Sequence, residues 1–226
     1  MLQNTECRDG LKRDRYIFRR GESGIHLPDQ YTQVRWRLRV IAVGQERYRE
    51  VLDEVPHVQC CDLALLMLYA PQGKEGADRA IVISHRQREQ WGKSVVQLYQ
   101  DAVTSCARAL PARLQSLKDA IGLPGEEKTA APECLVLTNE KNRFGAACIF
   151  YPGVQEEAAS RIGGSYFALP SSLHEMLLLK DDHMGDAASL KDIVCSVNRR
   201  EVEERDILTD SVYYYDAVLK KFRRVA

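Results

Sequence analysis

Residues 165–179 read SYFALPSSLHEMLLL, and the two apolar runs in this stretch flank a polar centre, Pro170 to Glu175. Proline cannot donate to a strand ladder and serine hydroxyls bond the local backbone, so Pro-Ser-Ser is typical of a turn. We therefore expect two strands, 166–169 and 173–179, joined at this turn. The same centre brings serine, histidine and glutamate close together along the chain, which makes it the first place to test for chemistry.

Outward from this stretch, pairs of apolar runs alternate with amphipathic segments. Successive hairpins with helices between them favour an α+β fold, a mixed, largely antiparallel sheet built from hairpins with helices packed against it. The near-continuous apolar run at 60–70 is typical of a strand that is buried on both faces. The expected strands and hairpins lie at 34–43, 60–84, 134–151, 166–179 and 211–222, and the expected helices at 46–55, 85–92, 94–110, 111–121, 154–162 and 187–199.

Composition also predicts the domain organisation. Residues 1–33 are basic and contain glycine and proline, so we expect a poorly structured or divergent N-terminal segment. Residues 34–226 are expected to form a single α+β domain. Two candidate halves, 34–122 and 133–226, lie on either side of a linker that is rich in proline, glycine and charge.

Charge and cysteine usage limit the classes of function. The 226 residues include 32 basic and 32 acidic side chains, so the net charge is zero, and we do not expect nucleic acid as a partner. Seven cysteines, most of them in apolar runs, favour reduced thiols in a cytoplasm. The first twenty residues lack the apolar segment of a signal peptide, and the longest apolar run is far shorter than the about 20 residues that span a bilayer. We expect a soluble, cytoplasmic protein that does not enter a membrane.

A metal site at His174 and Glu175 is the first chemistry to weigh. The zinc-peptidase pattern requires a second histidine three residues after the glutamate, and Leu178 stands there. In a strand, His174 and Glu175 would also point to opposite faces. His183 is a further weak candidate ligand. We therefore predict no metal site.

A hydrolase is the second chemistry, with Ser172, His174 and Glu175 as weak catalytic candidates. In a strand, Ser172 and His174 would share a face with Cβ atoms about 7 Å apart, too far for a reliable hydrogen bond. No G-x-S-x-G motif surrounds the serine. The alternative function is nevertheless a hydrolase or metal-dependent enzyme that uses the Pro-Ser-Ser-x-His-Glu stretch, with Asp182 or His183 as further members.

No cofactor is predicted. The glycine turns at 122–125 and 162–165 match no phosphate-binding motif and are typical of helix C-caps. Cys60 and Cys61 are adjacent in a predicted buried strand, where their side chains diverge and lack the exposed, electropositive setting that activates a thiol. We therefore do not expect thiol chemistry at this pair.

The C-terminal end is a candidate interaction surface. In a strand, at least one of three consecutive tyrosines faces outward, and exposed tyrosine beside arginine is common in protein interfaces. The alternative to an interaction surface is that one or two of the tyrosines lie in the core and the basic residues form a solvated tail. The pattern favours this alternative. The residues concerned are Tyr213, Tyr214, Tyr215, Lys220, Lys221, Arg223 and Arg224.

Three motifs carry a family resemblance: LVLTNEKNRFGAACIFYPGV, LPSSLHEMLLL and SVYYYDA, at 135–154, 169–179 and 211–217. With them, the chain resembles a bacterial domain-of-unknown-function family (DUF5688), which is distantly similar to another uncharacterised cytoplasmic bacterial family. The resemblance implies no activity, substrate or cofactor, so it supplies no catalytic residue. We predict an uncharacterised bacterial protein whose partner is unknown. We favour a binding or interaction module over an enzyme. The candidate partner is a protein.

Overall fold

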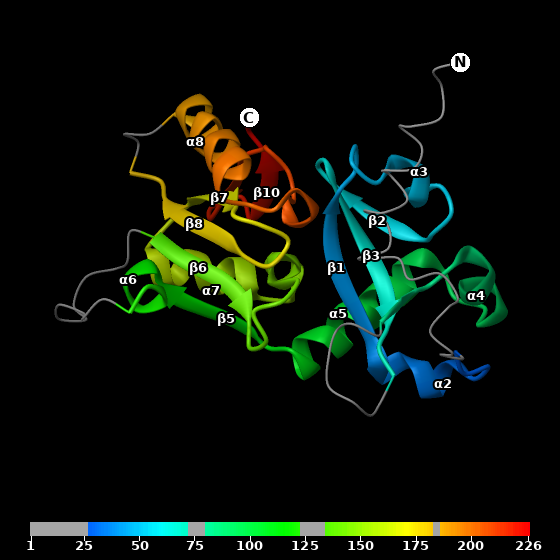
Figure 1. Ribbon diagram of the computed structural model, residues 1–226. Helices are drawn as coiled ribbons and strands as arrows, with labels where there is room; N and C mark the ends of the chain where they lie inside the picture. Colours follow the sequence, from blue (N-terminus) through cyan, green and yellow to red (C-terminus); the bar gives the residue numbers. More distant parts are fainter. Residues whose placement is uncertain (1–26, 72–79, 123–133, 183–185) are drawn as a thin grey trace, which may run out of the picture.

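The computed structural model describes residues 27–71, 80–122, 134–182 and 186–226. The strands form two sheets that lie side by side, with helices around them (Figure 1). Every strand pair in these ranges is antiparallel. The predicted α+β class, built from antiparallel hairpins with packed helices, is confirmed, and its strands are divided between two sheets.

The first sheet is built around β3 (Leu63–Tyr69), whose residues are all buried. β3 pairs with β1 (Leu38–Gly44) along one edge, and with β2 (His57–Cys60) and β4 (Ile81–Val82) along the other. A strand with neighbours on both edges and cover on both faces takes apolar side chains throughout, which explains the run LALLMLY. The predicted buried strand and its hairpin with β4 are confirmed.

The second sheet has six strands in the order β10-β9-β7-β8-β6-β5. The hairpins β7–β8 and β9–β10 confirm the strand pairs predicted around Pro170 and at the C-terminal end. The strands are β5 (Ala112–Ser116), β6 (Cys134–Asn139), β7 (Tyr166–Pro170), β8 (Met176–Lys180), β9 (Tyr213–Asp216) and β10 (Lys221–Arg224).

Helix ends follow local capping chemistry. α5 (Val95–Ala109) begins after Ser94, whose hydroxyl accepts from the backbone N–H of Gln97 in a capping box. α7 (Val154–Ile162) ends at Gly163, where φ is +87° and a side chain would be strained. The other helices are α2 (Tyr31–Val34), α3 (Arg49–Leu52), α4 (His85–Gln90), α6 (Leu117–Ala120) and α8 (Ala187–Arg200). No helix in the described part of the chain has the length and apolar character that a membrane span requires.

The predictions of the first strand, at 34–43, and of the first helix, at 46–55, were partly wrong. Residues 34–37 end α2 and form the 3-10 helix η1 (Arg35–Arg37), so the strand begins only at Leu38. Trp36, which falls within the strand expected at 34–43, is 51% exposed. The helix expected at 46–55 is reduced to the single turn of α3.

Two further predictions failed because long-range pairing outweighs local pattern. Residues 112–116 form β5 rather than a helix, because their backbone pairs along β6. The strand expected at 146–151 is instead a buried 3-10 helix, η3 (Gly145–Phe150), and β6 finds its partners in β5 and β8. A Cβ atom on Gly145 would lie 2.6 Å from the carbonyl oxygen of His174, so only glycine permits this close approach of backbones.

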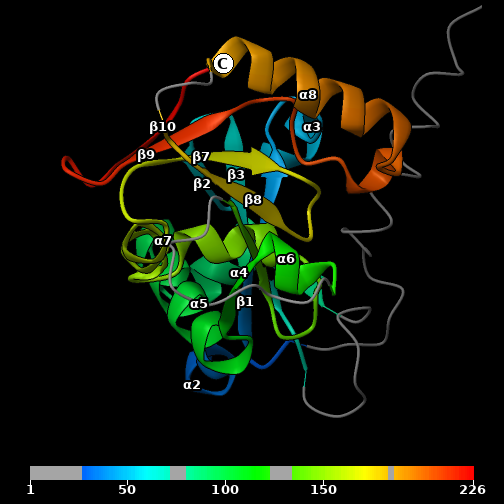
Figure 2. The ribbon, with the colours of Figure 1, turned by 90° about the vertical axis from the view of Figure 1, so that its left-hand side faces the viewer.

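One contiguous core joins the two sheets. Its buried members include Leu66 of β3 and Val43 of β1 from the first sheet, and Tyr166 of β7 and Leu178 of β8 from the second. In Figure 2, α8 lies on one side of the six-stranded sheet, and α7 and α5 lie on the other. The two candidate halves of the sequence therefore share a hydrophobic core.

The described chain starts inside the basic segment predicted at 1–33. Residues 1–26 of that segment lie outside the described residues. Leu27 and Tyr31 pack against a smaller core cluster between α5 and the first sheet. The Tyr31 hydroxyl donates to Asp101 Oδ2 at 2.8 Å, and the Arg35 Nε donates to Asp101 Oδ1 at 2.8 Å. These contacts attach α2 and η1 to α5.

We expect Leu66→Ala to lower the free energy of unfolding by about 2–5 kcal/mol, because the side chain is fully buried in the central strand and its loss leaves a cavity. Leu219→Ala is the matched control, since that leucine is 63% exposed and its change should stay within about 0.5 kcal/mol. Urea denaturation followed by circular dichroism measures both. Equal losses would contradict the central position of β3.

Candidate functional site

The Pro-Ser-Ser stretch forms the connection between β7 and β8. β7 ends at Pro170 and β8 begins at Met176, so Ser172, His174 and Glu175 lie in a loop. The expectation that His174 and Glu175 alternate across a strand is therefore wrong. The backbone N–H groups of Ser171 and Ser172 both donate to the Glu175 carbonyl at 3.3 Å, which closes the loop on itself.

The imidazole ring of His174 is engaged at both nitrogens. Its Nδ1 accepts from the backbone N–H of Phe144 at 3.0 Å, which places the proton of the neutral ring on Nε2. Nε2 faces Asp206 Oδ1 at 3.4 Å. The ring also packs against the Phe144 ring, with centroids 5.4 Å apart. The sequence did not reveal Asp206 as the partner, because no local pattern links residues 32 positions apart.

The neighbouring hydroxyls are turned away from this ring. Ser172 Oγ accepts from the backbone N–H of His174 at 3.0 Å, and Ser171 Oγ donates to Glu175 Oε1 at 3.0 Å. A hydrolytic triad needs a serine hydroxyl at one imidazole nitrogen and a carboxylate at the other. In this structure a backbone amide occupies the nitrogen that a serine would need.

The side chains weighed as metal ligands, His174 and Glu175, are also bonded to other groups. His174 contacts Asp206 rather than Glu175, whose carboxylate accepts from Ser171. Within the described ranges, no group of three histidine, cysteine or carboxylate side chains is arranged to hold a metal ion. His183, the second candidate ligand, lies outside the described residues.

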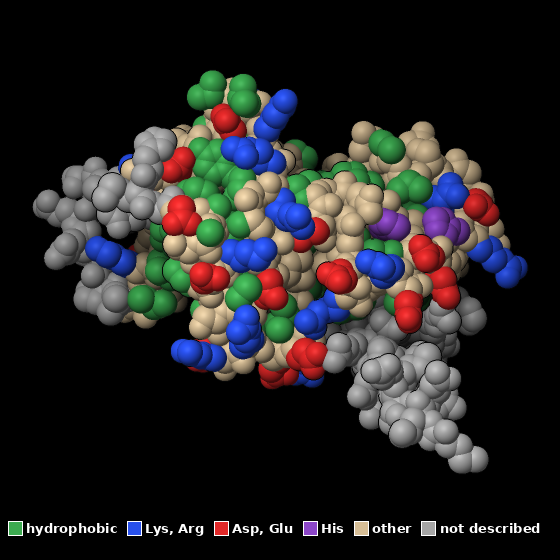
Figure 3. Space-filling view, turned by 90° about the horizontal axis from the view of Figure 1, so that it is seen from above, with side chains coloured by type: hydrophobic (Ala, Val, Ile, Leu, Met, Phe, Trp, Pro, Cys, Tyr) green, Lys and Arg blue, Asp and Glu red, His purple; other side chains and the backbone are tan. Residues whose placement is uncertain are grey.

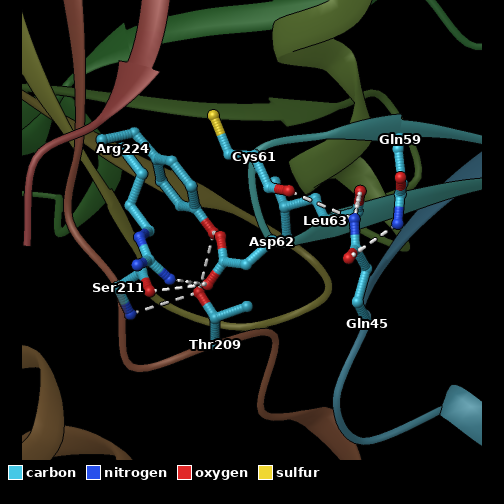
Figure 4. Close-up of polar contacts among 9 residues, drawn as sticks. Gln45, Gln59, Cys61, Asp62, Leu63, Thr209, Ser211 and Arg224 are labelled. Carbon is cyan, nitrogen blue, oxygen red and sulfur yellow. Dashed lines mark hydrogen bonds and ion pairs between the residues drawn. The ribbon is translucent and has the colours of Figure 1, made fainter.

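A second polar cluster surrounds Asp62, in the turn between β2 and β3 (Figure 4). Asp62 Oδ1 accepts from the Tyr213 hydroxyl at 2.7 Å, and Oδ2 accepts from the Ser211 hydroxyl at 2.7 Å. The Arg224 guanidinium lies 3.6 Å from Oδ2. Thr209 Oγ1 lies 2.9 Å from the Tyr213 hydroxyl. The cluster joins the first sheet to the last hairpin of the second sheet, a link that the sequence did not reveal.

Burial raises the pKa of Tyr213, and the neighbouring Asp62 carboxylate adds to the effect, while Thr209 opposes it. The tyrosine therefore keeps its proton at neutral pH and serves as a hydrogen-bond donor. A buried hydroxyl that donates to a carboxylate makes a charge-assisted bond, which is stronger than one between neutral groups. The cluster is thus a structural contact between the sheets.

Gln45 fixes the turn that carries Asp62. Its Nε2 donates to the Leu63 carbonyl at 2.9 Å and to the Cys61 carbonyl at 3.2 Å, and its Oε1 accepts from Gln59 at 3.0 Å. Cys61 is exposed and has a φ of +58°. The expectation that Cys61 lies within a buried strand is therefore wrong.

The C-terminal hairpin divides the three tyrosines between two environments. Tyr213 and Tyr215 are buried in the main core, and only Tyr214 keeps exposed surface. The Tyr214 hydroxyl donates to Asp181 Oδ2 at 2.7 Å, and the Arg223 guanidinium lies over its ring. A direct interaction role for these tyrosines stays a prediction, and Tyr214 is the one with surface to offer.

The tip of this hairpin exposes apolar side chains. Val218 is 89% exposed and Leu219 is 63% exposed. Asp216 Oδ1 accepts from the backbone N–H groups of both residues, at 3.0 and 2.8 Å, and Ala217 N donates to Ser165 Oγ at 3.0 Å. The tip therefore has a defined backbone conformation.

Comparison with known protein families places most of the chain in one family. The model of a family of unknown function (DUF5688) matches residues 19–217. The match includes nine of the ten strands found in the described residues, and it ends just before the exposed hairpin tip. No curated protein and no solved structure matches the chain.

We expect His174→Ala to lower the free energy of unfolding by about 1–3 kcal/mol, because the Phe144 N–H loses its acceptor. His85→Ala, which removes a histidine from the first turn of α4, is the control and should have a smaller effect. Thermal denaturation compares the two variants, and elemental analysis of purified protein measures bound metal. A His174→Ala variant that loses bound metal but keeps its stability would instead support the alternative function, a metal-dependent enzyme.

A double-mutant cycle tests the contact between the sheets. We expect Asp62→Ala and Tyr213→Phe to show a coupling energy of about 1–3 kcal/mol in urea denaturation, because each change removes one partner of a charge-assisted bond. Asp62→Ala with Tyr214→Phe is the control cycle, since Tyr214 bonds to Asp181 instead, and these effects should add. Additivity in the first cycle would show that the bond contributes nothing to stability.

Proposed function

The chain belongs to this family of unknown function, and we propose that it is a protein-binding module whose contact surface is the tip of the C-terminal hairpin. The observation that carries the proposal is the exposure of Val218 and Leu219, the two most exposed large hydrophobic side chains in the described ranges. An exposed apolar pair on an ordered turn is a candidate anchor for a pocket on a partner.

The tip is held in place before any partner binds. Asp216 fixes its backbone through two hydrogen bonds, and Lys220 closes the turn with a φ of +51°. β9 is anchored below it by the buried Tyr213 and Tyr215. A pre-ordered contact loses little conformational entropy on binding, so a small apolar anchor yields more affinity.

Charge around the tip indicates the chemistry of the partner. The exposed basic side chains of the turn and of β10 are Lys220, Lys221, Arg223 and Arg224. Basic side chains around an apolar anchor favour a partner with an apolar pocket and an acidic rim. Elsewhere, lysine and arginine intermingle with aspartate and glutamate over the face in Figure 3. This mixture agrees with the zero net charge and supports a protein partner over nucleic acid.

The shape of the hairpin supports this role. Figure 2 shows the β9–β10 hairpin projecting beyond the rest of the ribbon. β10 is also an edge strand of the six-stranded sheet, and its charged side chains limit unspecific pairing with other strands. A projecting tip reaches a concave partner without moving the core.

We place this activity in the bacterial cytoplasm. The cysteines of the described ranges are all free thiols, which is typical of proteins in a reducing compartment. The bacterial origin rests on the family resemblance of the sequence. Fractionation of the native cells tests the location.

The test is affinity purification from native cells with quantitative mass spectrometry. We expect the double variant Val218→Ser/Leu219→Ser to lower recovery of the specific partner by at least about tenfold, because the apolar anchor is lost. The control is Ile193→Ser/Val197→Ser, which removes an exposed apolar pair from α8 and should leave recovery unchanged. Circular dichroism confirms that both variants fold. Equal recovery by the wild type and the hairpin variant would overturn the proposal.

A further inference from the structure

The two edge strands of the six-stranded sheet differ in what covers them. The strand order places β10 at one edge and β5 at the other. At the β5 edge, the Leu114 carbonyl accepts from the Arg161 guanidinium at 2.9 Å, so a side chain of α7 occupies that edge. At the β10 edge, the described residues form no such bond. An edge strand with unpaired backbone groups is a template on which another strand can pair.

The pairing of β10 with β9 determines which of its backbone groups are open. In an antiparallel pair, the N–H and C=O groups of every second residue face the partner strand. The backbone N–H of Val225 donates to the Val212 carbonyl at 2.8 Å, so Val225 faces β9. The register then turns Arg223 toward β9 as well, and it turns the backbone groups of Phe222 and Arg224 outward. The edge therefore offers two N–H donors and two carbonyl acceptors.

The side chains along this edge are basic. Lys221, Arg223 and Arg224 are all exposed. Among the described residues, only Arg224 of these three forms an ion pair, with Asp62 at 3.6 Å, and Arg223 lies over the ring of Tyr214. Like charges on directly opposed strands are unfavourable, so these side chains disfavour pairing with a second copy of β10. They favour a strand that carries acidic side chains.

We infer that the open edge of β10 receives an extended, acidic segment of the protein partner, which pairs with it as an additional strand. Recognition of this kind takes its affinity from main-chain hydrogen bonds and its specificity from side chains. The inference rests on the proposed role of the hairpin as a contact surface. The tip at 218–219 supplies the apolar anchor, and β10 supplies the strand pairing. Both belong to the hairpin that projects from the ribbon in Figure 2.

A defined peptide tests the pairing without the natural partner. The probe is a synthetic, end-blocked peptide of alternating threonine and glutamate residues, because threonine favours strands. We expect it to bind the folded full-length chain, with changed chemical shifts and slower amide exchange at Phe222 and Arg224 in ¹H–¹⁵N NMR spectra. The matched peptide with lysine in place of glutamate should bind at least about tenfold more weakly. NMR titration measures both affinities.

A proline substitution tests the hydrogen bonds of the edge. Arg224→Pro removes an N–H that faces outward, and proline is tolerated on an edge strand at such a position. Arg224→Ala is the matched control, because it loses the same side chain but keeps the N–H. We expect Arg224→Pro to bind the glutamate peptide at least about tenfold more weakly than Arg224→Ala does. Circular dichroism checks that both variants fold.

A charge reversal gives a second test that does not depend on proline. Lys221→Glu/Arg223→Glu should weaken binding of the glutamate peptide by about tenfold and strengthen binding of the lysine peptide, because the sign of the edge changes. An unchanged preference between the peptides would overturn the inference. So would equal binding of the glutamate peptide by Arg224→Pro and Arg224→Ala, or wild-type protein that binds neither peptide.

The peptide also separates this inference from the proposed function of the tip. Val218→Ser/Leu219→Ser should bind the glutamate peptide as the wild type does, because the peptide pairs with the edge alone. Partner recovery that falls in the tip variant, together with a peptide that does not bind, would overturn only the strand pairing. A peptide that binds at β10, together with unchanged recovery by the tip variant, would support the pairing and overturn only the role of the tip.

Discussion

The Asp62 carboxylate makes the polar contact on which the relation between the two sheets depends. It sits in a turn of the first sheet and accepts hydrogen bonds from Ser211 and Tyr213, which belong to the end of the second. A partly buried carboxylate is costly unless its oxygens are satisfied, and here two hydroxyls and the Arg224 guanidinium offset that cost. Since β9 also pairs with β7, the same contact positions the edge of the six-stranded sheet.

A similar use of polar groups explains the loop between β7 and β8. His174, Thr138 and Asp206 join three segments: Thr138 Oγ1 donates to the His174 carbonyl, and the Leu173 N–H donates to the Asp206 carbonyl at 2.7 Å. The residues that suggested an active site therefore satisfy backbone groups where β6, η3 and η4 (Glu204–Asp206) meet. A buried backbone group without a partner is unfavourable, so loops inside a core need such side chains.

The same turn that anchors the sheets also exposes the Cys61 side chain. Asp62 points to the C-terminal hairpin, and Cys61 points away from that carboxylate. At the tip of the same hairpin, Asp216 accepts hydrogen bonds from the backbone N–H groups of Val218 and Leu219 and so fixes the turn that exposes their side chains. Neighbouring side chains thus impose the conformation of both turns, and the hairpin tip exposes its apolar side chains on a rigid support.

The sequence alone determined the features that arise within a few residues of one another. The Ser94 cap, the Gly163 stop, the buried strand β3 and the β7–β8 hairpin all follow from capping, turn and periodicity rules. The resemblance to the family also came from local motifs. These signals are reliable because hydrogen bonds between near neighbours and the burial of one face act over short stretches of chain.

Only the tertiary structure determined the rest. Residues 112–116 became a strand because β6 lies beside them, and residues 145–150 became a buried 3-10 helix because backbones approach closely at Gly145. The bond between Asp62 and Tyr213 spans 151 positions, and that between Phe144 and His174 spans 30. Such partners are selected by the packing of whole elements around a shared core, and no local sequence pattern encodes which residues that packing brings together.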